Sequence, residues 1–437
     1  MFERPQSGEK AILVHVDLTS EDQKEQLQEF EELALSAGAS IEGTVNGRRD
    51  RPDPKYFVGT GKVDEIQQLV ERQQADLVLF NHTLSPSQER NLEARLQCRV
   101  LDRTGLILDI FAQRARSFEG KLQVELAQLK HLSTRLIRGW THLERQKGGI
   151  GLRGPGETQL ETDRRLLAQR IKQINRRLEK VTSQREQGRQ SRKKAEVPTI
   201  ALVGYTNAGK STLFNALTDS AVYAQDQLFA TLDPTLRRLE LDDACTVIFA
   251  DTVGFIRHLP HDLVNAFKST LQETKEADLL LHVIDGADDN RLNNIDEVNQ
   301  VLRDIGADEV PQIQVMNKID LLDLEPWIDR DDQNEVKRIW VSAEKNLGLD
   351  KLRAVLLDKF KQDLVRAEIC LGPAEARIRA LLFDIGAIKS ERIDEKGNSL
   401  LSLSVTKRDL NQLASREGLD IKQFLSNKSL AGTEHHS

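Results

Sequence analysis

The segment with the clearest chemical signature is a glycine-rich loop that follows the short apolar run TIALV. The loop GYTNAGKS (204–211) matches the pattern Gly-x4-Gly-Lys-Ser and leads into the helix-forming stretch TLFNALTD. Gly204 and Gly209 allow successive backbone N–H groups to face phosphates, reinforced by the N-terminus of the helix. Lys210 can reach the β- and γ-phosphates, and the Ser211 hydroxyl can bind magnesium. The loop therefore predicts a site for a nucleoside triphosphate with Mg2+.

A second motif, DTVG (251–254), follows the apolar run CTVIFA and indicates a sensor for the terminal phosphate. Asp251 can hold magnesium through a water molecule, and the Gly254 amide can contact the γ-phosphate. Many Ras-like GTPases place a glutamine directly after this motif, where it orients the attacking water. Here that position is Phe255, so we expect slow hydrolysis unless another group or a partner positions the water.

A third motif, NKID (317–320), selects the base. Asn317 can tie the loops together, the Lys318 stem can cover the base, and Asp320 can accept two N–H bonds from guanine. Adenine has no matching donor pair and would leave a buried carboxylate unsatisfied, at a cost of about 1.5–3 kcal/mol. The pair Ser342–Ala343 can present a backbone amide to the guanine oxygen. The motifs together predict an enzyme that hydrolyses GTP to GDP and phosphate.

Between the first two motifs lies LFATLDPTLRR (228–238), the expected switch segment. Such a segment needs a threonine whose hydroxyl meets magnesium when the γ-phosphate is present. Thr231 and Thr235 both qualify, and sequence spacing does not choose between them.

The elements that must position these loops indicate a multidomain α/β protein. Residues 1–118 alternate strand and helix signals, with strands expected at 11–18 and 76–80 and a helix at 85–96, so we expect a small domain with a mainly parallel sheet. GTGK at 59–62 lacks the first glycine of a phosphate loop and is interpreted as a turn. Residues 198–365 form the expected GTPase domain. Residues 366–437 suggest a small α+β domain with a helix near 373–384, a hairpin across 395–398, a further helix and a disordered tail.

Residues 119–197 predict a long antiparallel helical hairpin, because apolar residues recur every seven positions. One stripe is Leu122, Leu129, Leu136 and Leu143, with Leu126 and Trp140 between them; the other is Leu160, Leu167, Ile174 and Val181, with Ile171 and Leu178 between them. A helix over 122–147 would be about 39 Å long. The glycine-rich loop 148–156, flanked by Arg145, Lys147 and Arg153, would lie at the tip. Residues 183–197 are interpreted as frayed helix and linker.

Charge is distributed very unevenly over the 437 residues, whose formal net charge is −7. Residues 130–194 contain 18 Lys and Arg against 6 Asp and Glu, a balance of +12, which leaves −19 for the rest. A basic arm on an acidic body is typical of proteins that neutralise nucleic-acid phosphates. The alternative interpretation is an ordinary solvated helix face.

Composition indicates a cytoplasmic protein. The three cysteines have no metal-ligand or redox spacing, the first ten residues contain no apolar stretch, and the apolar runs are too short to span a bilayer. We also expect a monomer.

Four segments together resemble the HflX GTPases of the Obg–HflX superfamily: YFVGTGK (56–62), GLRGPGETQLETDRR (151–165), FATLDPTLRR (229–238) and DTVGFIRHLPHDLV (251–264). The resemblance covers about residues 50–345 closely. It implies binding to the ribosome, mainly the large subunit, and splitting of stalled or idle ribosomes. It also implies ribosomal RNA as the ligand of the arm, and a ribosome that stimulates turnover despite an apolar residue at the Phe255 position. ATP use and RNA unwinding are associated with the N-terminal region in this family, but the sequence shows no second phosphate loop.

The resemblance assigns the magnesium-sensing role to Thr231, which completes the predicted site. Catalytic roles are predicted for Lys210, Thr231 and Gly254, and magnesium binding for Ser211, Thr231 and, through water, Asp251. The remaining predicted contacts with the nucleotide are made by these same loops: Gly204, Tyr205, Thr206, Asn207, Ala208, Gly209, Thr212, Phe229, Ala230, Leu232, Asp233, Thr252, Val253, Asn317, Lys318, Ile319, Asp320, Ser342, Ala343 and Glu344.

Two other functions remain open at this point. The chain could be an assembly factor for the large subunit, or a GTPase switch whose partner is a protein and whose basic arm contacts no RNA.

Overall fold

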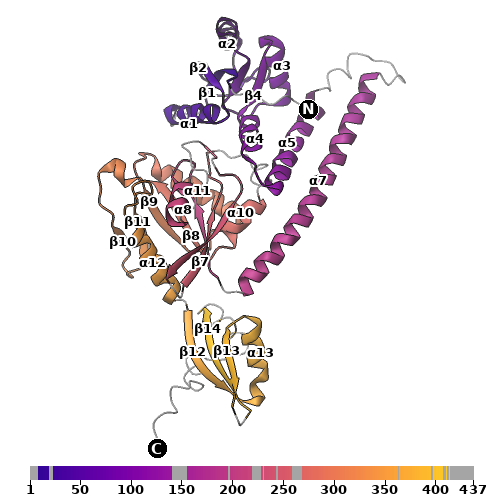
Figure 1. Cartoon of the computed structure of the whole chain (residues 1–437). Coiled ribbons are helices and arrows are strands. Elements are labelled where there is room, and N and C mark those ends of the chain that lie inside the picture. The colour runs from indigo at the N-terminus through magenta and orange to yellow at the C-terminus, as the bar shows by residue number, and fades with distance from the viewer. Residues whose placement is uncertain are drawn as a thin grey trace, which may run out of the picture.

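The computed structural model places four parts in succession along the chain (Figure 1). An N-terminal sheet domain is followed by a pair of long helices, a GTPase-type domain and a small C-terminal sheet. The structure describes residues 8–18, 23–139, 155–194, 197–218, 228–229, 231–242, 245–257, 268–362, 364–394, 397–406, 410 and 413.

The N-terminal domain contains a parallel sheet, as the sequence predicts, and the structure shows four strands in the order β2-β1-β3-β4. Its strands are β1 (Lys10–Asp17), β2 (Ser40–Arg48), β3 (Leu77–Phe80) and β4 (Arg99–Asp102). Its helices are α1 (Gln23–Ser36), α2 (Thr60–Gln73), α3 (Pro86–Leu96) and α4 (Arg103–Arg114). Helices α1 and α4 cover one face and α2 and α3 the other, which explains why β3 is apolar throughout and why every residue of β1 after Lys10 is buried.

The GTGK segment begins a helix and is not the isolated turn expected from sequence. Gly59 is the residue before α2, and Thr60 to Lys62 form its first turn. A helix can start here because Gly59 adopts an extended conformation, with φ −70° and ψ 157°.

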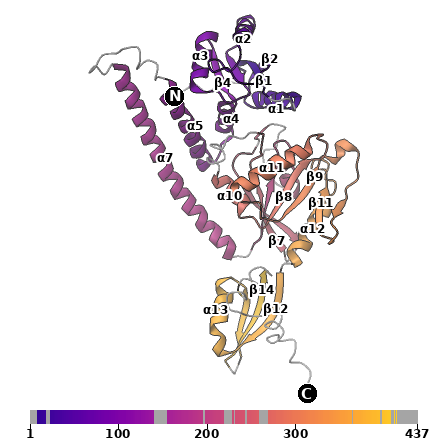
Figure 2. The same cartoon turned by 180° about the vertical axis from the view of Figure 1, so that it is seen from behind.

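Helices α5 (Phe118–Gly139) and α7 (Pro155–Lys194) lie side by side and form the arm (Figures 1 and 2). Leu122, Leu126 and Ile174 are buried between them, with further contacts from Leu129, Ile171 and Leu178. These are seam positions of the two heptad stripes, so the pairing follows the sequence prediction.

The limits of the arm differ from the expected ones. Helix α7 continues to Lys194, whereas residues 183–194 were expected to fray; this stretch is rich in Gln, Arg and Lys and contains no proline, so nothing in it stops a helix. Pro155 and Gly156 belong to the first turn of α7 and not to the tip loop, because proline is favoured at that position. Arg145, Lys147, Arg153 and the rest of the tip lie outside the described residues, as do Trp140 and Leu143.

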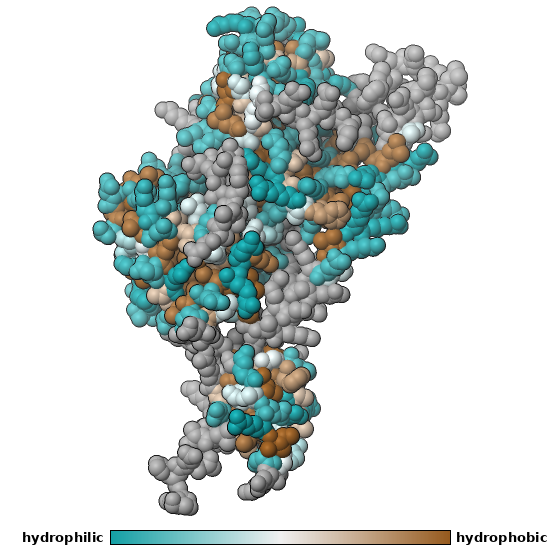
Figure 3. Space-filling model, in the orientation of Figure 1, coloured by the Kyte–Doolittle hydropathy of each residue, from teal (hydrophilic) through white to brown (hydrophobic). Residues whose placement is uncertain are grey.

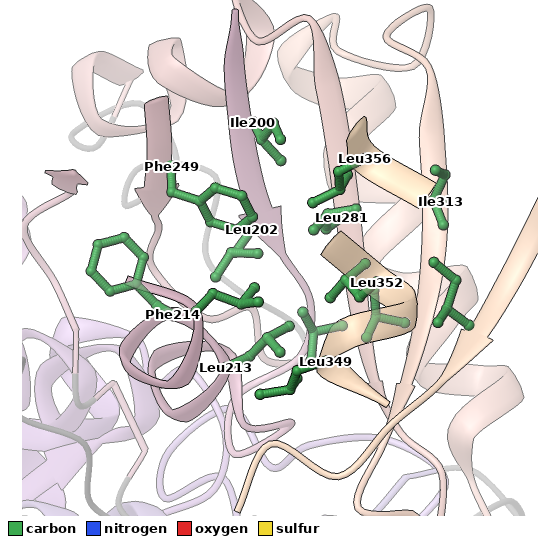
Figure 4. Close-up of a cluster of buried hydrophobic side chains, with 14 of the residues drawn as sticks. Ile200, Leu202, Leu213, Phe214, Phe249, Leu281, Ile313, Leu349, Leu352 and Leu356 are labelled. Carbon is green, nitrogen blue, oxygen red and sulfur yellow. The ribbon is translucent and has the colours of Figure 1, made fainter. Parts of the chain in front are cut away.

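The GTPase-type domain is a seven-stranded sheet in the order β10-β11-β9-β8-β5-β7-β6, antiparallel only at its two edge strands. Its strands are β5 (Thr199–Val203), β6 (Thr235–Asp242), β7 (Cys245–Asp251), β8 (Leu279–Asp285), β9 (Gln312–Asn317), β10 (Ile328–Arg330) and β11 (Val336–Trp340). Its helices are α8 (Lys210–Thr218), α10 (Lys268–Lys275), α11 (Arg291–Ile305) and α12 (Leu349–Gln362). Figure 4 shows the core on one face, where Leu213 and Phe214 of α8 and Leu352 of α12 meet the sheet.

The C-terminal domain is a small antiparallel sheet in the order β12-β14-β13, beyond the end of α12 in Figure 1. Its strands are β12 (Leu364–Leu371), β13 (Ile388–Ile393) and β14 (Ser399–Thr406). One face is covered by α13 (Ala376–Asp384), which follows a short 3-10 turn at Pro373–Glu375. The predicted further helix and the tail lie almost wholly outside the described residues. Among the described helices of the whole chain, none is long and apolar enough to cross a membrane.

Candidate nucleotide site

The loops that contain the predicted motifs lie together at the carboxyl ends of parallel strands in the seven-stranded sheet of the GTPase-type domain, which is called the central sheet below. Strands β5, β7, β8 and β9 are parallel, so the segments that follow them emerge together. In the glycine-rich loop, Gly204 and Gly209 have φ values of +151° and +89°. A Cβ on Gly204 would lie 2.2 Å from the Val283 carbonyl oxygen, and one on Gly209 would lie 2.2 Å from Nδ2 of Asn317. Both glycines are therefore required by close packing as well as by backbone conformation.

Three oxygen-bearing side chains come together where magnesium is predicted. The Ser211 hydroxyl donates to Oδ2 of Asp251 at 2.7 Å, and the Thr231 hydroxyl donates to the same oxygen at 2.9 Å. The two hydroxyl oxygens are 2.8 Å apart. Thr235, the other candidate, is the first residue of β6, where its backbone is paired with Asp251. The geometry thus favours Thr231 as the magnesium-sensing threonine.

Asp251 is fully buried, and its second oxygen, Oδ1, has no hydrogen-bond partner among the described residues. Burial raises the pKa of this carboxyl, partly opposed by the hydrogen bond from Ser211 and the charge of Lys210. A buried carboxylate with an unused oxygen beside two hydroxyls is the hard oxygen donor set that Mg2+ prefers. The residues therefore fit a magnesium ion.

Lys210 is buried beside the predicted γ-phosphate sensor. Its Nζ donates to the carbonyls of Gly204 at 3.1 Å and Tyr205 at 2.7 Å. Burial lowers its pKa to about 8, opposed by the charge of Asp251. A Cβ on Gly254 would lie 2.9 Å from this Nζ and 3.0 Å from Cα of Thr206, so the DTVG backbone passes close to both the lysine and the backbone of the glycine-rich loop.

The base-selecting loops are joined through Asn317. Its Nδ2 donates to the Ala208 carbonyl at 2.9 Å, and its Oδ1 accepts from the Ala343 amide at 2.9 Å. The amide expected to face guanine is thus donated to Asn317 in this structure, because the two loops pack directly on each other. Lys318 has φ +64° and pairs with Asp285 at 2.8 Å. Oδ1 of Asp320 is buried and has no partner among the described residues, as an acceptor reserved for a ligand would be.

Several residues of the predicted switch segment face the N-terminal domain. The Phe229 ring packs edge-on against Phe111 of α4, with centroids 4.7 Å apart, and Leu232 is buried in the same cluster. The Asp233 carboxylate accepts from the amides of Arg116 at 2.8 Å and Ser117 at 2.7 Å, at the start of α5. In this structure the side chains of these three residues are therefore directed toward the N-terminal part of the chain. The partner surface is more than a hundred residues away in sequence and could not be inferred locally.

Other predicted contact residues have side chains directed into the protein. The Thr252 hydroxyl donates to the Leu202 carbonyl, and Val253 and Ile319 are buried in the core. Ser342 is buried, and Glu344 beside it is exposed. Thr212 follows Ser211 in α8, and Asn207 adopts φ +62° in the glycine-rich loop. Ala230 lies outside the described residues.

A hydrogen-bonded cluster joins the N-terminal domain to the GTPase-type domain, and no sequence motif predicted it. The Tyr205 hydroxyl donates to Glu29 of α1 and accepts from the Arg257 amide at 2.9 Å. Arg103 of α4 also pairs with Glu29 and donates to the Arg257 carbonyl at 3.0 Å. Burial beside Glu29 raises the pKa of Tyr205. The phosphate loop and the segment after DTVG are thus both joined to the N-terminal domain.

Three family models match the chain in order. Residues 24–112 match "GTP-binding GTPase N-terminal", 114–192 match "GTP-binding GTPase Middle Region", and 199–318 match "50S ribosome-binding GTPase".

Curated relatives match over nearly the whole length. A protein named GTPase HflX from Escherichia coli is 59% identical over 95% of this chain and 98% of its own length. GTPase HflX from Caldanaerobacter subterraneus is 49% identical over 92% of both chains. Among solved structures, the complex of SsGBP with GDP matches with TM-score 0.48 and 26% identity over 81% of this chain and 99% of that one.

Proposed function

The chain belongs to the HflX family of GTPases, and on that premise we propose that it binds the large ribosomal subunit and splits stalled or idle ribosomes into subunits. The observation that carries the proposal is the 59% identity over 95% of the chain to a GTPase HflX. The match of residues 199–318 to a 50S ribosome-binding GTPase model agrees with the large subunit as partner. We further propose that the protein acts as a cytoplasmic monomer.

In the GTPase cycle we propose, Ser211 and Thr231 hold Mg2+ directly and Asp251 holds it through water. The ion supplies charge neutralisation between the β- and γ-phosphates. Lys210 neutralises the same phosphates, the Gly254 amide contacts the γ-phosphate, and Asp320 selects guanine. Support comes from the convergence of Ser211, Thr231 and Asp251 within hydrogen-bond distance.

The arm supplies the RNA-binding surface in this proposal. Along the described part of α7, the cations that lie away from the α5 seam are exposed, and the outer face of the helix is mainly hydrophilic in Figure 3. These residues are Arg164, Arg165, Lys172, Arg176, Arg177 and Lys180. Exposed cations in a row can neutralise successive phosphates of an RNA backbone.

Sedimentation of ribosomes with the protein and a non-hydrolysable GTP analogue tests the proposal. Splitting shrinks the monosome peak and increases free subunits. An assembly factor would leave monosomes intact while large-subunit precursors accumulate in a deletion strain. A switch with a protein partner would not co-sediment with ribosomes at all.

Charge removal on the arm tests the RNA contact directly. The double variant Arg176→Gln and Arg177→Gln should weaken ribosome binding and flatten its salt dependence, because fewer phosphates are neutralised. Arg392→Gln, at an equally exposed cation of the C-terminal sheet, is the matched control and should bind normally. Equal binding by the arm variant and the wild type would contradict the assignment.

Measuring GTP turnover with and without purified large subunits tests whether ribosome binding stimulates GTP hydrolysis. Phe255 cannot orient water, so we expect slow hydrolysis by the free protein and strong acceleration by large subunits. Equal rates in both conditions would argue against a ribosomal partner.

A further inference from the structure

We propose that the Thr206 hydroxyl positions the attacking water during GTP hydrolysis, the role that a glutamine after DTVG performs in other GTPases. The proposal concerns the GTPase reaction itself and does not depend on ribosome splitting.

The side chain of Phe255 is excluded from this role by its packing. It is 2% exposed and belongs to a core cluster with Val203, Leu271 and Leu280. Its backbone is fixed to the phosphate loop, since its amide donates to the Gly204 carbonyl at 3.2 Å and its carbonyl accepts from the Thr206 amide at 2.8 Å. This pairing holds the Thr206 backbone against the segment that carries the γ-phosphate sensor.

The methyl carbon Cγ2 of Thr206 lies close to both groups expected to contact the γ-phosphate. A Cβ on Gly254 would be 2.8 Å from Cγ2 of Thr206 and 2.9 Å from Nζ of Lys210. Thr206 thus packs on Gly254 at the same point as the Lys210 ammonium. A γ-phosphate held by Lys210 and Gly254 would have the Thr206 side chain as its neighbour.

The hydroxyl of Thr206 is also unused by the protein. Threonine 206 is 6% exposed, and its Oγ1 is buried without a hydrogen-bond partner within the described part of the chain. Leaving a buried hydroxyl unpaired destabilises the folded protein, because the hydrogen bonds that the group made to water are not replaced. A hydroxyl that is retained at such a cost, beside a reaction centre, is suited to bind a water molecule when the nucleotide is present.

Thr206 borders a cleft of about 380 Å³, from which the water would reach the hydroxyl in this proposal. The other lining residues include Glu29 of α1, Arg257 after DTVG, His282 of β8 and Asn294 of α11. Most of the lining side chains are polar or charged, so the cleft is polar enough to hold water.

The step balances without any group beyond water and GTP. The water oxygen bonds to the γ-phosphorus while the bond from phosphorus to the β–γ bridging oxygen breaks, and GDP leaves with that electron pair. The water proton passes to a γ-phosphate oxygen. Thr206 accepts a hydrogen bond from the water, stays protonated, and acts by orientation alone.

The test compares Thr206→Val, which keeps the shape and removes the hydroxyl, with Thr206→Ser, which keeps the hydroxyl. Single-turnover hydrolysis by the full-length protein should slow at least about tenfold in Thr206→Val, while its Kd for GTP stays within about twofold of wild type. Thr206→Ser should hydrolyse close to the wild-type rate. The matched control is Thr274→Val in α10, another buried threonine whose Oγ1 lacks a partner among the described residues, and it should leave hydrolysis unchanged.

Two outcomes would overturn the proposal. Wild-type hydrolysis by Thr206→Val would show that the hydroxyl is not needed. Equal slowing in Thr206→Val and Thr206→Ser would show that packing on Gly254, and not the hydroxyl, is what matters.

Discussion

Two buried aspartates at the ends of parallel strands have opposite roles in the two sheets. Asp102 ends β4 in the N-terminal sheet and Asp251 ends β7 in the central sheet, and they are 1% and 0% exposed. Asp102 uses both oxygens within the protein, accepting from the Gly105 amide at 2.8 Å, the Leu84 amide at 3.2 Å and Arg135 of α5 at 2.9 Å. Asp251 keeps one oxygen unpaired among the described residues.

The difference distinguishes a structural joint from a proposed ligand site, although both aspartates end a strand of a sheet. Through Arg135, Asp102 anchors the arm to the N-terminal domain, and its neighbour Arg103 holds the Arg257 carbonyl of the central domain. Asp251 can bind a cation through Oδ1, because no described hydrogen-bond donor of the protein occupies that oxygen. For these two equally buried aspartates, the oxygen left unpaired among the described residues is what separates the proposed ligand site from the joint.

The largest expected effect is loss of turnover in Asp251→Asn. Removing the charge that helps hold magnesium should lower GTP turnover at least about a hundredfold, since a metal ion contributes several kcal/mol to phosphoryl transfer. Steady-state turnover at saturating Mg2+ measures this, and wild-type rates in the folded variant would remove Asp251 from the site.

Asp251→Asn should also raise the free energy of unfolding, although it lowers turnover. The pKa of Asp251 is raised by burial, so the folded state disfavours its ionised form, and stability is lost as pH rises above the ordinary carboxyl range near 3.8. Asp251→Asn should therefore have a higher unfolding free energy than the wild type at pH 7. The gain should shrink as pH falls, and denaturant unfolding at several pH values checks it.

Asp102→Ala should show the reverse pattern. Removing one partner of a buried ion pair and the cap of α4 should cost about 3–5 kcal/mol of unfolding free energy. Affinity for GDP should change by less than about twofold in the folded protein, because Asp102 belongs to the joint with the arm. Denaturant unfolding and calorimetry measure the two quantities; a large loss of GDP affinity at normal stability would erase the contrast with Asp251.

Asp320→Asn tests whether a second buried carboxylate oxygen that is unpaired among the described residues also binds a ligand. Replacing an acceptor by a donor should weaken GDP binding by about 1.5–3 kcal/mol, roughly 10- to 150-fold, and improve binding of xanthosine diphosphate. Calorimetry with both nucleotides tests this, and an unchanged GDP affinity would refute the role of Asp320.

The smallest effect is expected at an ion pair of the arm that is exposed to solvent. Nη2 of Arg170 in α7 lies 2.6 Å from Oε1 of Glu125 in α5, and the two side chains are 42% and 36% exposed. A double-mutant cycle with alanine should give about 0.2–1 kcal/mol, because solvent screens the pair and its side chains lose entropy. A coupling as large as that of the buried Asp102–Arg135 pair would show that burial does not set the difference.

The sequence by itself determined the features that depend on local spacing. Gly204 and Gly209 are needed by the conformation of a phosphate loop, and the heptad stripes placed Leu126 and Ile174 in the seam of the arm. The alternation of strand and helix signals likewise predicted a parallel N-terminal sheet. Each of these follows from backbone geometry or periodicity within a short window.

Only the tertiary structure decided which predicted site residues come together and which face a neighbouring domain. It brought Thr231 to Ser211 and Asp251, and it directed Asp233 to the start of α5, 116 residues away in sequence from Ser117. It also left the hydroxyl of Thr206 unpaired within the described residues. The physical reason is that partners and burial arise from contacts between distant segments, which no local pattern in the chain records.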